Sequence, residues 1–192
     1  MRVDERGFQR PLWLLLLVLW EAFFIKNVRN MVLTSLFAAL ITVCAWMAVP
    51  IPPVGFTLQT LGVLLALGIL GGKRGTCAIG LYLLLGLVGL PVFSGFRGGA
   101  AAVLGPTGGF LWGFLAMALC YWLLEGLGKL PAMAAGQLVC YGCGCFWYTV
   151  YAPGTSLWAA AAVCVAPYLI PDVVKLALAY HISCRIRRNL SI

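Results

Sequence analysis

Two ionisable residues lie inside an apolar segment near the carboxyl end of the chain, where charge is costly. Asp172 and Lys175 interrupt the run from Leu157 to Ile182. A charged side chain at membrane depth costs several kcal/mol unless it is paired or faces a polar cavity. At a spacing of three residues the two side chains share one helix face and can support each other. The pair therefore predicts a polar ligand site, with an internal salt bridge that fixes helix packing as the alternative.

Arg97 is the third residue with a charge in an unusual setting. It lies in a glycine-rich segment, Gly95-Phe96-Arg97-Gly98-Gly99, in which the backbone can turn tightly or approach a ligand. Arginine binds a carboxylate through two parallel hydrogen bonds, whereas lysine acts as a point charge. We therefore expect Arg97 and Lys175 to hold a carboxylate while Asp172 accepts hydrogen bonds from the same ligand. The alternative for Arg97 is an exposed loop charge.

Aromatic residues gather near the same predicted membrane face as Arg97. Most of them are expected to form an interfacial belt, because amphipathic rings concentrate where a bilayer meets water. The remainder are candidates for the wall of a pocket. The residues are Phe56, Phe93, Phe96, Trp147, Tyr148, Tyr151 and Tyr168.

Catalytic, cofactor-binding and metal-binding motifs are missing from the sequence. The segment Gly71-Gly72-Lys73-Arg74 lacks the spacing and the Ser/Thr of a phosphate-binding loop, and neither GxSxG nor HExxH occurs. Cys140 and Cys143 form a CxxC with no second ligand pair, so they are interpreted as small residues of a packing face. We therefore expect no enzyme, cofactor or metal site. A membrane enzyme or an assembly factor remains the alternative from another class.

The elements that must position these residues are membrane helices. Of 192 residues, 63% are hydrophobic and 9% are charged, and the mean hydropathy is +1.02, whereas soluble domains are about 25% charged. Spans of about 20 residues leave room for one domain of six helices. The sequence thus predicts an all-α, polytopic bundle of six transmembrane helices within residues 31–188. The expected spans are 31–49, 57–70, 77–90, 107–124, 132–151 and 157–182.

Basic residues are distributed unequally between the alternate loops. Eight of them fall on one side and only Arg97 on the other, which predicts that both termini, including the tail 189–192, are cytoplasmic. This topology also accounts for the net charge of +8 without nucleic acid, since no basic helix is interleaved with aromatic residues. The eight are Lys26, Arg29, Lys73, Arg74, Lys129, Arg185, Arg187 and Arg188.

Residues 1–30 do not fit the six-span scheme. The apolar stretch from Leu12 to Ile25 is short for a span and contains Glu21, and no small-residue cleavage site follows it. An interfacial helix, an upstream start that is not native, and an uncleaved signal or extra span are the three interpretations. We treat residues 1–30 as an N-terminal extension.

Small residues line one face of the first span. Ser35 and Ala39 have small-xxx-small spacing, with Ala38 beside them, and Gly109 and Gly113 repeat the spacing in the fourth span. Such faces allow another helix to approach closely, either within the fold or from a partner.

Several blocks of the sequence, in order, resemble the BioY family of biotin transporters. They include Pro50-Ile51-Pro52-Pro53-Val54-Gly55-Phe56-Thr57, Gly89-Leu90-Pro91-Val92-Phe93 with Arg97-Gly98-Gly99, and Pro171-Asp172-Val173-Val174-Lys175, which resembles the PDxxK stretch of the family. Together the blocks extend over about residues 31–188, so the resemblance covers nearly the full length of the chain.

The resemblance implies a substrate-binding subunit, or S component, of an energy-coupling factor (ECF) transporter in a prokaryotic plasma membrane. Its partners are expected to be biotin, the lipid bilayer, a transmembrane coupling protein and two ATP-binding-cassette ATPases. The polar contacts to biotin are expected from Arg97, Asp172 and Lys175, with Gly98, Phe93, Tyr148 and Tyr168 beside them. Ser35, Ala38 and Ala39 match the motif that meets the coupling protein, with serine in place of the usual first alanine. An S component for another carboxylated vitamin or a biotin precursor is the alternative.

Overall fold

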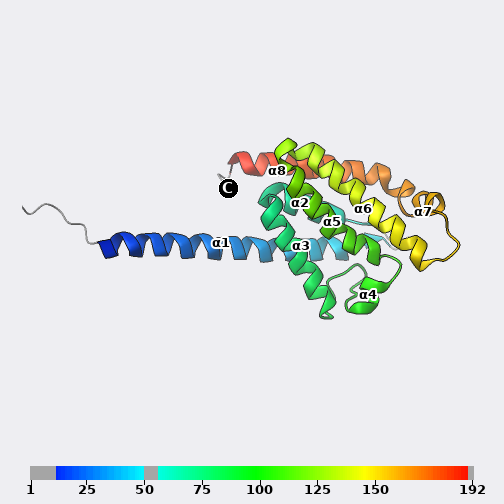
Figure 1. Cartoon of the computed structure of the whole chain (residues 1–192), viewed down its shortest axis with the longest axis horizontal. Helices are drawn as coiled ribbons and strands as arrows, with labels where there is room; N and C mark the ends of the chain where they lie inside the picture. The colour runs from blue at the N-terminus through cyan, green and yellow to red at the C-terminus, as the bar shows by residue number, and fades with distance from the viewer. Residues whose placement is uncertain (1–11, 50–55, 190–192) are drawn as a thin grey trace, which may run out of the picture. The chain divides into compact units, whose positions relative to one another are not determined.

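The computed structural model describes the backbone of residues 12–49 and 56–189, and side chains from residue 27 onwards within these ranges. The described chain is predominantly helical (Figure 1), which confirms the predicted all-α class. The elements are α1 (Leu12–Trp46), β1 (Ala48–Val49), β2 (Phe56–Thr57), α2 (Gln59–Leu70), α3 (Gly72–Leu87), α4 (Ala100–Leu104), α5 (Gly108–Leu124), the 3₁₀ turn η1 (Glu125–Leu127), α6 (Lys129–Tyr151), α7 (Leu157–Cys164), the 3₁₀ turn η2 (Ala166–Tyr168) and α8 (Leu169–Asn189).

The chain divides into two compact units, and the boundary between them lies between Leu33 and Thr34, inside α1. Helix α1 continues without interruption through Asn30 and Met31, so the predicted end of the N-terminal extension at residue 30 lies inside a helix. Residues 1–11, 50–55 and 190–192 lie outside the described residues, and with them most of the block from Pro50 to Thr57 that resembles the BioY family.

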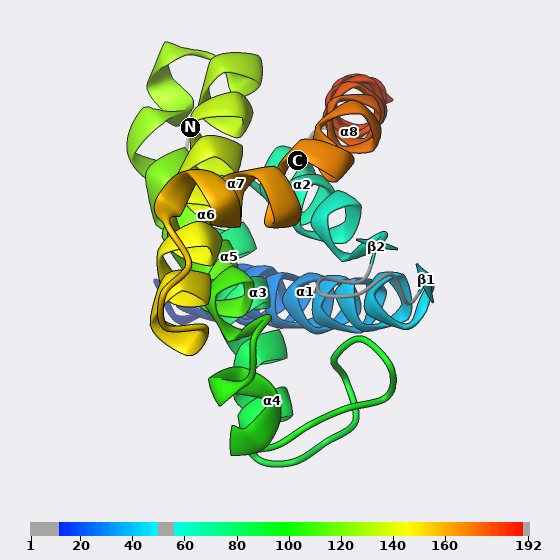
Figure 2. The same cartoon turned by 90° about the vertical axis from the view of Figure 1, so that its right-hand side faces the viewer.

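The second unit is built from closely packed helices. Helix α2 packs along α8 and α5 packs along α6, while α7 lies between the end of α6 and the start of α8 (Figure 2). Glycines allow the close approach: a Cβ atom at Gly113 would lie 3.0 Å from the Cys140 sulfur, and one at Gly68 would lie 2.7 Å from the Ser183 Cβ. The interpretation of Gly113 and Cys140 as packing positions is confirmed.

The structure corrects several predicted boundaries. Helix α3 begins at Gly72 rather than at Cys77, because Gly71 reverses the chain with φ of +84°, a conformation in which glycine carries no steric penalty. The segment after Pro91 contains the short helix α4 instead of being a loop throughout. The expected span 157–182 is divided at Pro167, since η2 separates α7 from α8 there.

Three helical segments among the described residues are long and apolar enough to cross a membrane. They are Asn27–Trp46, Gly108–Leu127 and Leu157–Asn189, and α2 is a shorter apolar helix. Together with the composition, these segments identify an all-α membrane-protein fold.

Candidate substrate-binding site

Helix α8 turns one narrow face towards the rest of its unit. Asp172, Lys175, Ala179 and Ser183 are its buried residues, at spacings of three and four. This is the period of one side of an α-helix. The two charged residues are 7% and 5% exposed, so neither is solvated as a surface charge would be.

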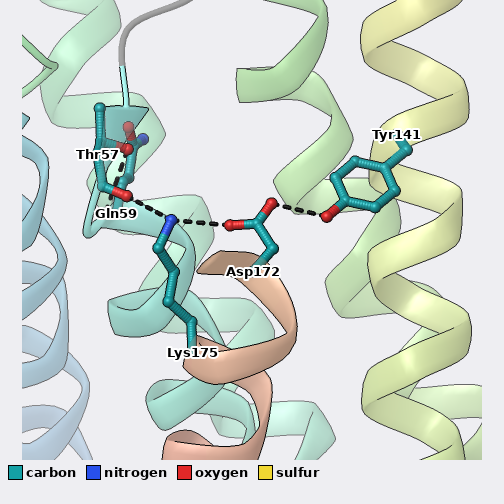
Figure 3. A network of polar contacts seen from close by, with 5 residues as sticks. All are labelled: Thr57, Gln59, Tyr141, Asp172 and Lys175. Atoms are coloured by element: carbon teal, nitrogen blue, oxygen red, sulfur yellow. Dashed lines mark hydrogen bonds and ion pairs between the residues drawn. The ribbon is translucent and has the colours of Figure 1, made fainter. Parts of the chain in front are cut away.

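The ammonium group of Lys175 has three partners, two of which, Asp172 and Thr57, are drawn in Figure 3. It donates to Oδ1 of Asp172 at 2.8 Å and to the backbone oxygen of Thr57 at 2.7 Å. It also lies 4.2 Å from the centre of the Phe56 ring, a cation–π contact. An ammonium has three protons to donate, and the hydrogen bonds to Asp172 and Thr57 use two of them. One donor therefore remains for a ligand.

Tyr141 of α6 completes the partners of Asp172. Its hydroxyl donates to Oδ2 at 2.7 Å, so each carboxylate oxygen accepts one hydrogen bond (Figure 3). Carboxylate oxygens have further lone pairs, which a ligand N–H can approach. The group joins side chains of α6 and α8 to the strand β2.

A second layer of contacts fixes the position of Thr57. The strands β1 and β2 are antiparallel, with Ala48 opposite Thr57. The Thr57 hydroxyl accepts from the Gln59 backbone N–H at 3.3 Å, and the Gln59 amide donates to the Tyr82 hydroxyl at 2.8 Å. Tyr82 is completely buried in α3. The carbonyl that holds Lys175 is thus supported from α2 and α3.

Gln137 is buried one helical turn before Tyr141 on α6. Its side chain is 6% exposed, and its Oε1 has no hydrogen-bond partner among the described residues. A buried acceptor without a donor costs about 1–3 kcal/mol. The oxygen is therefore available to an N–H group of a ligand.

The segment that carries Arg97 is held by its backbone. The Arg97 carbonyl accepts from the Phe93 N–H at 2.9 Å, and the Phe93 ring is buried 5.4 Å from the ring of Tyr82. The Arg97 side chain is exposed, and within the described ranges it has no ion pair. The structure brings Asp172 and Lys175 together, and Arg97 is not part of their hydrogen-bonded group.

Gly98 has a structural role in the same segment. A Cβ atom there would collide with the backbone oxygen of Leu90. Next to it, Phe96 adopts φ of +58° and stacks on Trp46, whose indole donates to the Pro91 oxygen at 2.8 Å. These contacts hold the segment against the end of α1.

The other predicted site residues are distributed over three elements. Tyr148 is half-buried near the end of α6, and Tyr168 is buried in η2, directly before α8. Ser35, Ala38 and Ala39 line an apolar cavity of about 510 Å³ between α1 and α3. Its remaining lining is Thr42, Val43, Trp46, Leu81, Leu85 and Val92.

Sequence reasoning missed four residues of the candidate site around Asp172 and Lys175. Gln59 and Gln137 carried a signal, because each is an isolated amide within an apolar run. Tyr141 was considered only as part of the cysteine-rich segment. Thr57 contributes a backbone oxygen, which no residue type reveals. Among the described residues there is no cluster of three potential metal ligands.

Known proteins resemble this chain over most of its length. The sequence model of the BioY family matches residues 18–192, which includes part of the N-terminal extension. The biotin transporter BioY of Thermotoga maritima is 38% identical over 165 residues, covering 83% of this chain and 96% of that protein. The biotin transporter BioY of Rhodobacter capsulatus is 41% identical over 171 residues, covering 78% and 88%.

A solved structure shares the fold. It is the S component for biotin from an ECF-type ABC transporter, which superimposes with a TM-score of 0.77 at 29% identity. The alignment covers 85% of this chain and 93% of that structure.

Proposed function

Because the chain belongs to the BioY family, we propose that it is the biotin-binding S component of an ECF transporter. It captures biotin and passes it across the membrane together with an ATP-driven module. The observation that carries the proposal is the buried Lys175–Asp172 pair on α8, an intramembrane charge pair that retains unused donor and acceptor capacity.

In the proposed complex the two ends of biotin meet different groups. Lys175 donates its remaining proton to the carboxylate of the valeryl chain. The ureido ring offers N–H groups to an acceptor, for which the partnerless Oε1 of Gln137 is suited, while Asp172 holds the ammonium of Lys175 in position. The bicyclic ring lies against aromatic side chains, as apolar ligand bodies commonly do.

Arg97 and its neighbours are proposed to complete the carboxylate end of the site. Arg97 adds a second positive group for the carboxylate, reaching it from the segment that Phe93 anchors. Gly98 keeps the backbone of that segment close to Leu90. Tyr148 and Tyr168 serve as the aromatic wall.

The proposed topology has six membrane crossings, formed by α1, α2, α3, α5, α6 and the α7–α8 segment. Both termini lie in the cytoplasm of a prokaryotic cell, and biotin enters from outside. Lys73, Arg74, Lys129 and Arg187 support this arrangement because they line one common cavity, as residues on one membrane face should.

The apolar cavity beside Ser35, Ala38 and Ala39 is proposed as the docking site of the coupling protein. Ser35 and Ala39 are exposed, so another helix can approach the α1 backbone there. The two ABC ATPases act through this coupling protein, since this chain has no phosphate-binding loop of its own.

Isothermal titration of the purified, detergent-solubilised chain with biotin tests the ligand. Saturable heat is expected for the wild type and for Arg185→Met, which removes an exposed charge at the far end of α8. Lys175→Met should weaken binding severely, and Arg97→Gln should weaken it as well. Wild-type affinity after neutralising both Arg97 and Lys175 would show that the site is wrong.

Titrations with two further ligands, biotin amide and dethiobiotin, show which chemical groups of the ligand the protein recognises. Biotin amide lacks the carboxylate, so it should bind weakly to the wild type and lose little more in Lys175→Met. Dethiobiotin keeps the carboxylate and the ureido group but lacks the sulfur ring. Tighter binding of dethiobiotin than of biotin would identify a precursor as the substrate.

A further inference from the structure

A polar cavity lies at the opposite end of α8 from the Lys175 group. Its volume is about 460 Å³, and it is formed where α2, α5 and α8 end and where α3 and α6 begin. It is lined by Leu70, Gly71, Gly72, Lys73, Arg74, Tyr121, Glu125, Lys129 and Arg187.

The charges around this cavity are unbalanced. Four basic side chains face one carboxylate, that of Glu125. One Glu125 oxygen already accepts a hydrogen bond of 2.7 Å from the backbone N–H of Gly72, the first residue of α3. The lining therefore carries three positive charges more than negative ones. Such clustered cations attract an anion.

Two arginines provide donors that point to a specific ligand. Arg187 is anchored by its Nε, which donates to the Ile69 oxygen at 3.0 Å. Its Nη2 lies 2.9 Å from the place where a Cβ atom at Gly71 would stand, so glycine leaves room for the guanidinium. Arg74 has a buried Nη1 with no hydrogen-bond partner among the described residues. An unpaired buried donor of this kind is costly unless a ligand accepts from it.

We propose that this cavity binds a phosphate group. A phosphate offers several acceptor oxygens and negative charge, and the guanidinium fork matches its geometry. Arg74 and Arg187 supply the directed hydrogen bonds, while Lys73 and Lys129 contribute point charges. The site is separate from the Lys175 group, because none of its lining residues belongs to that group.

The phosphate has two possible sources with the same chemistry. The cavity lies at helix ends, where the head groups of a bilayer are placed, and basic pockets between membrane helices bind anionic head groups. A soluble phosphate compound would meet the same donors.

The experiment measures the thermal unfolding midpoint of the full chain in a mild detergent. Phosphatidylglycerol is titrated in one arm, inorganic phosphate in a second, and zwitterionic phosphatidylcholine in a third. Variants Arg74→Gln and Lys129→Gln remove cavity donors. Arg188→Gln removes an exposed charge from the same end of α8 outside the cavity lining, so it is the matched control.

A midpoint that rises with phosphatidylglycerol but not with phosphatidylcholine is expected for the wild type and the control. Arg74→Gln should weaken the apparent affinity about tenfold or more, as the loss of a charged hydrogen bond predicts. A rise with inorganic phosphate that is lost in Arg74→Gln supports the proposal too, with a soluble ligand. Equal shifts in the wild type and both cavity variants, or no shift with either of the two anionic ligands, phosphatidylglycerol and inorganic phosphate, would overturn it. Biotin titration of each variant reports separately on the other site.

Discussion

The hydroxyl of Tyr141 on α6 donates a 2.7 Å hydrogen bond to Oδ2 of Asp172 on α8. The other carboxylate oxygen accepts from Lys175 at 2.8 Å. Asp172 thereby links two helices that have only a limited contact elsewhere. The carboxylate is held in one orientation before any ligand arrives, and this preorganisation lowers the cost of binding.

Tyr141→Phe is expected to reduce both stability and biotin affinity. The variant keeps the ring but leaves Oδ2 of Asp172 without its donor. Interhelical hydrogen bonds in membrane proteins contribute about 1–2 kcal/mol at most. We expect a loss of about that size in unfolding free energy, measured by thermal denaturation in detergent, together with weaker binding in calorimetry.

The control for this variant is Tyr180→Phe. Tyr180 lies on α8 beyond Lys175, where its ring packs edge to face against His181. Removing its hydroxyl should change neither measurement. If Tyr141→Phe bound biotin as the wild type does, Tyr141 would have only a packing role.

The Asp172–Lys175 pair is expected to show strong energetic coupling. Lys175→Met leaves a buried carboxylate without its cation, and breaking a buried pair from one side costs about 3–5 kcal/mol. Asp172→Asn leaves a buried ammonium without its anion, with a similar cost. The double variant removes both charges, so its stability should exceed the value that the two single losses predict.

Biotin affinity should respond differently from the free energy of unfolding when the wild type, the two single variants and the double variant are compared. The double variant is expected to fold well but to bind biotin no better than Lys175→Met does, because the donor for the carboxylate is still missing. Thermal unfolding and calorimetry on all four proteins provide the data. Additive stability losses would mean that the two charges do not interact in the folded protein.

Hydropathy and the charges of the loops were sufficient to predict the helical fold. Runs of apolar residues bounded by glycine and proline placed most helices within a few residues. The errors arose where backbone geometry decides the boundary. Gly71 reverses the chain in one residue, so Lys73 and Arg74 begin α3 instead of forming a loop. The paired strands around Thr57 are only two residues long each, too short for hydrophobic periodicity to reveal them.

The site was predictable only in part. Asp172 and Lys175 could be found because charge within an apolar run is unusual and their spacing sets them on one face. Tyr141 and Gln137 lie on another helix, so their proximity to Asp172 depends on how α6 packs. Arg97 was expected to act together with the pair; its side chain is exposed and lies outside their hydrogen-bonded group, so its part in ligand binding stays a prediction for the titrations to test.

Ala39→Leu is expected to separate transport from binding. Ala39 is exposed on α1 and lines the apolar cavity beside Ser35. A leucine fills the space that a partner helix would use, without disturbing the Lys175 group. Biotin binding in detergent should therefore stay unchanged, while uptake into cells that contain the ECF module should fall strongly.

Ala177→Leu provides the matched control for this change. Ala177 is exposed on α8 and lies outside the cavity. Its substitution adds the same side chain to a different surface, so uptake should be retained. If the Ala39→Leu variant transported biotin at the wild-type rate, this face of α1 would not be the docking site of the coupling protein.

Gly86→Ala is expected to damage the segment that carries Arg97. The added Cβ would collide with the Phe93 ring, which anchors that segment, and overpacking of this kind costs about 1–3 kcal/mol. Thermal unfolding should show this loss, and calorimetry should show weaker biotin binding. Gly80→Ala lies on the same helix with no atom within 4 Å of its new Cβ, so it should gain up to about 1 kcal/mol from helix propensity. Equal behaviour of the two variants would mean that the Phe93 contact does not constrain α3.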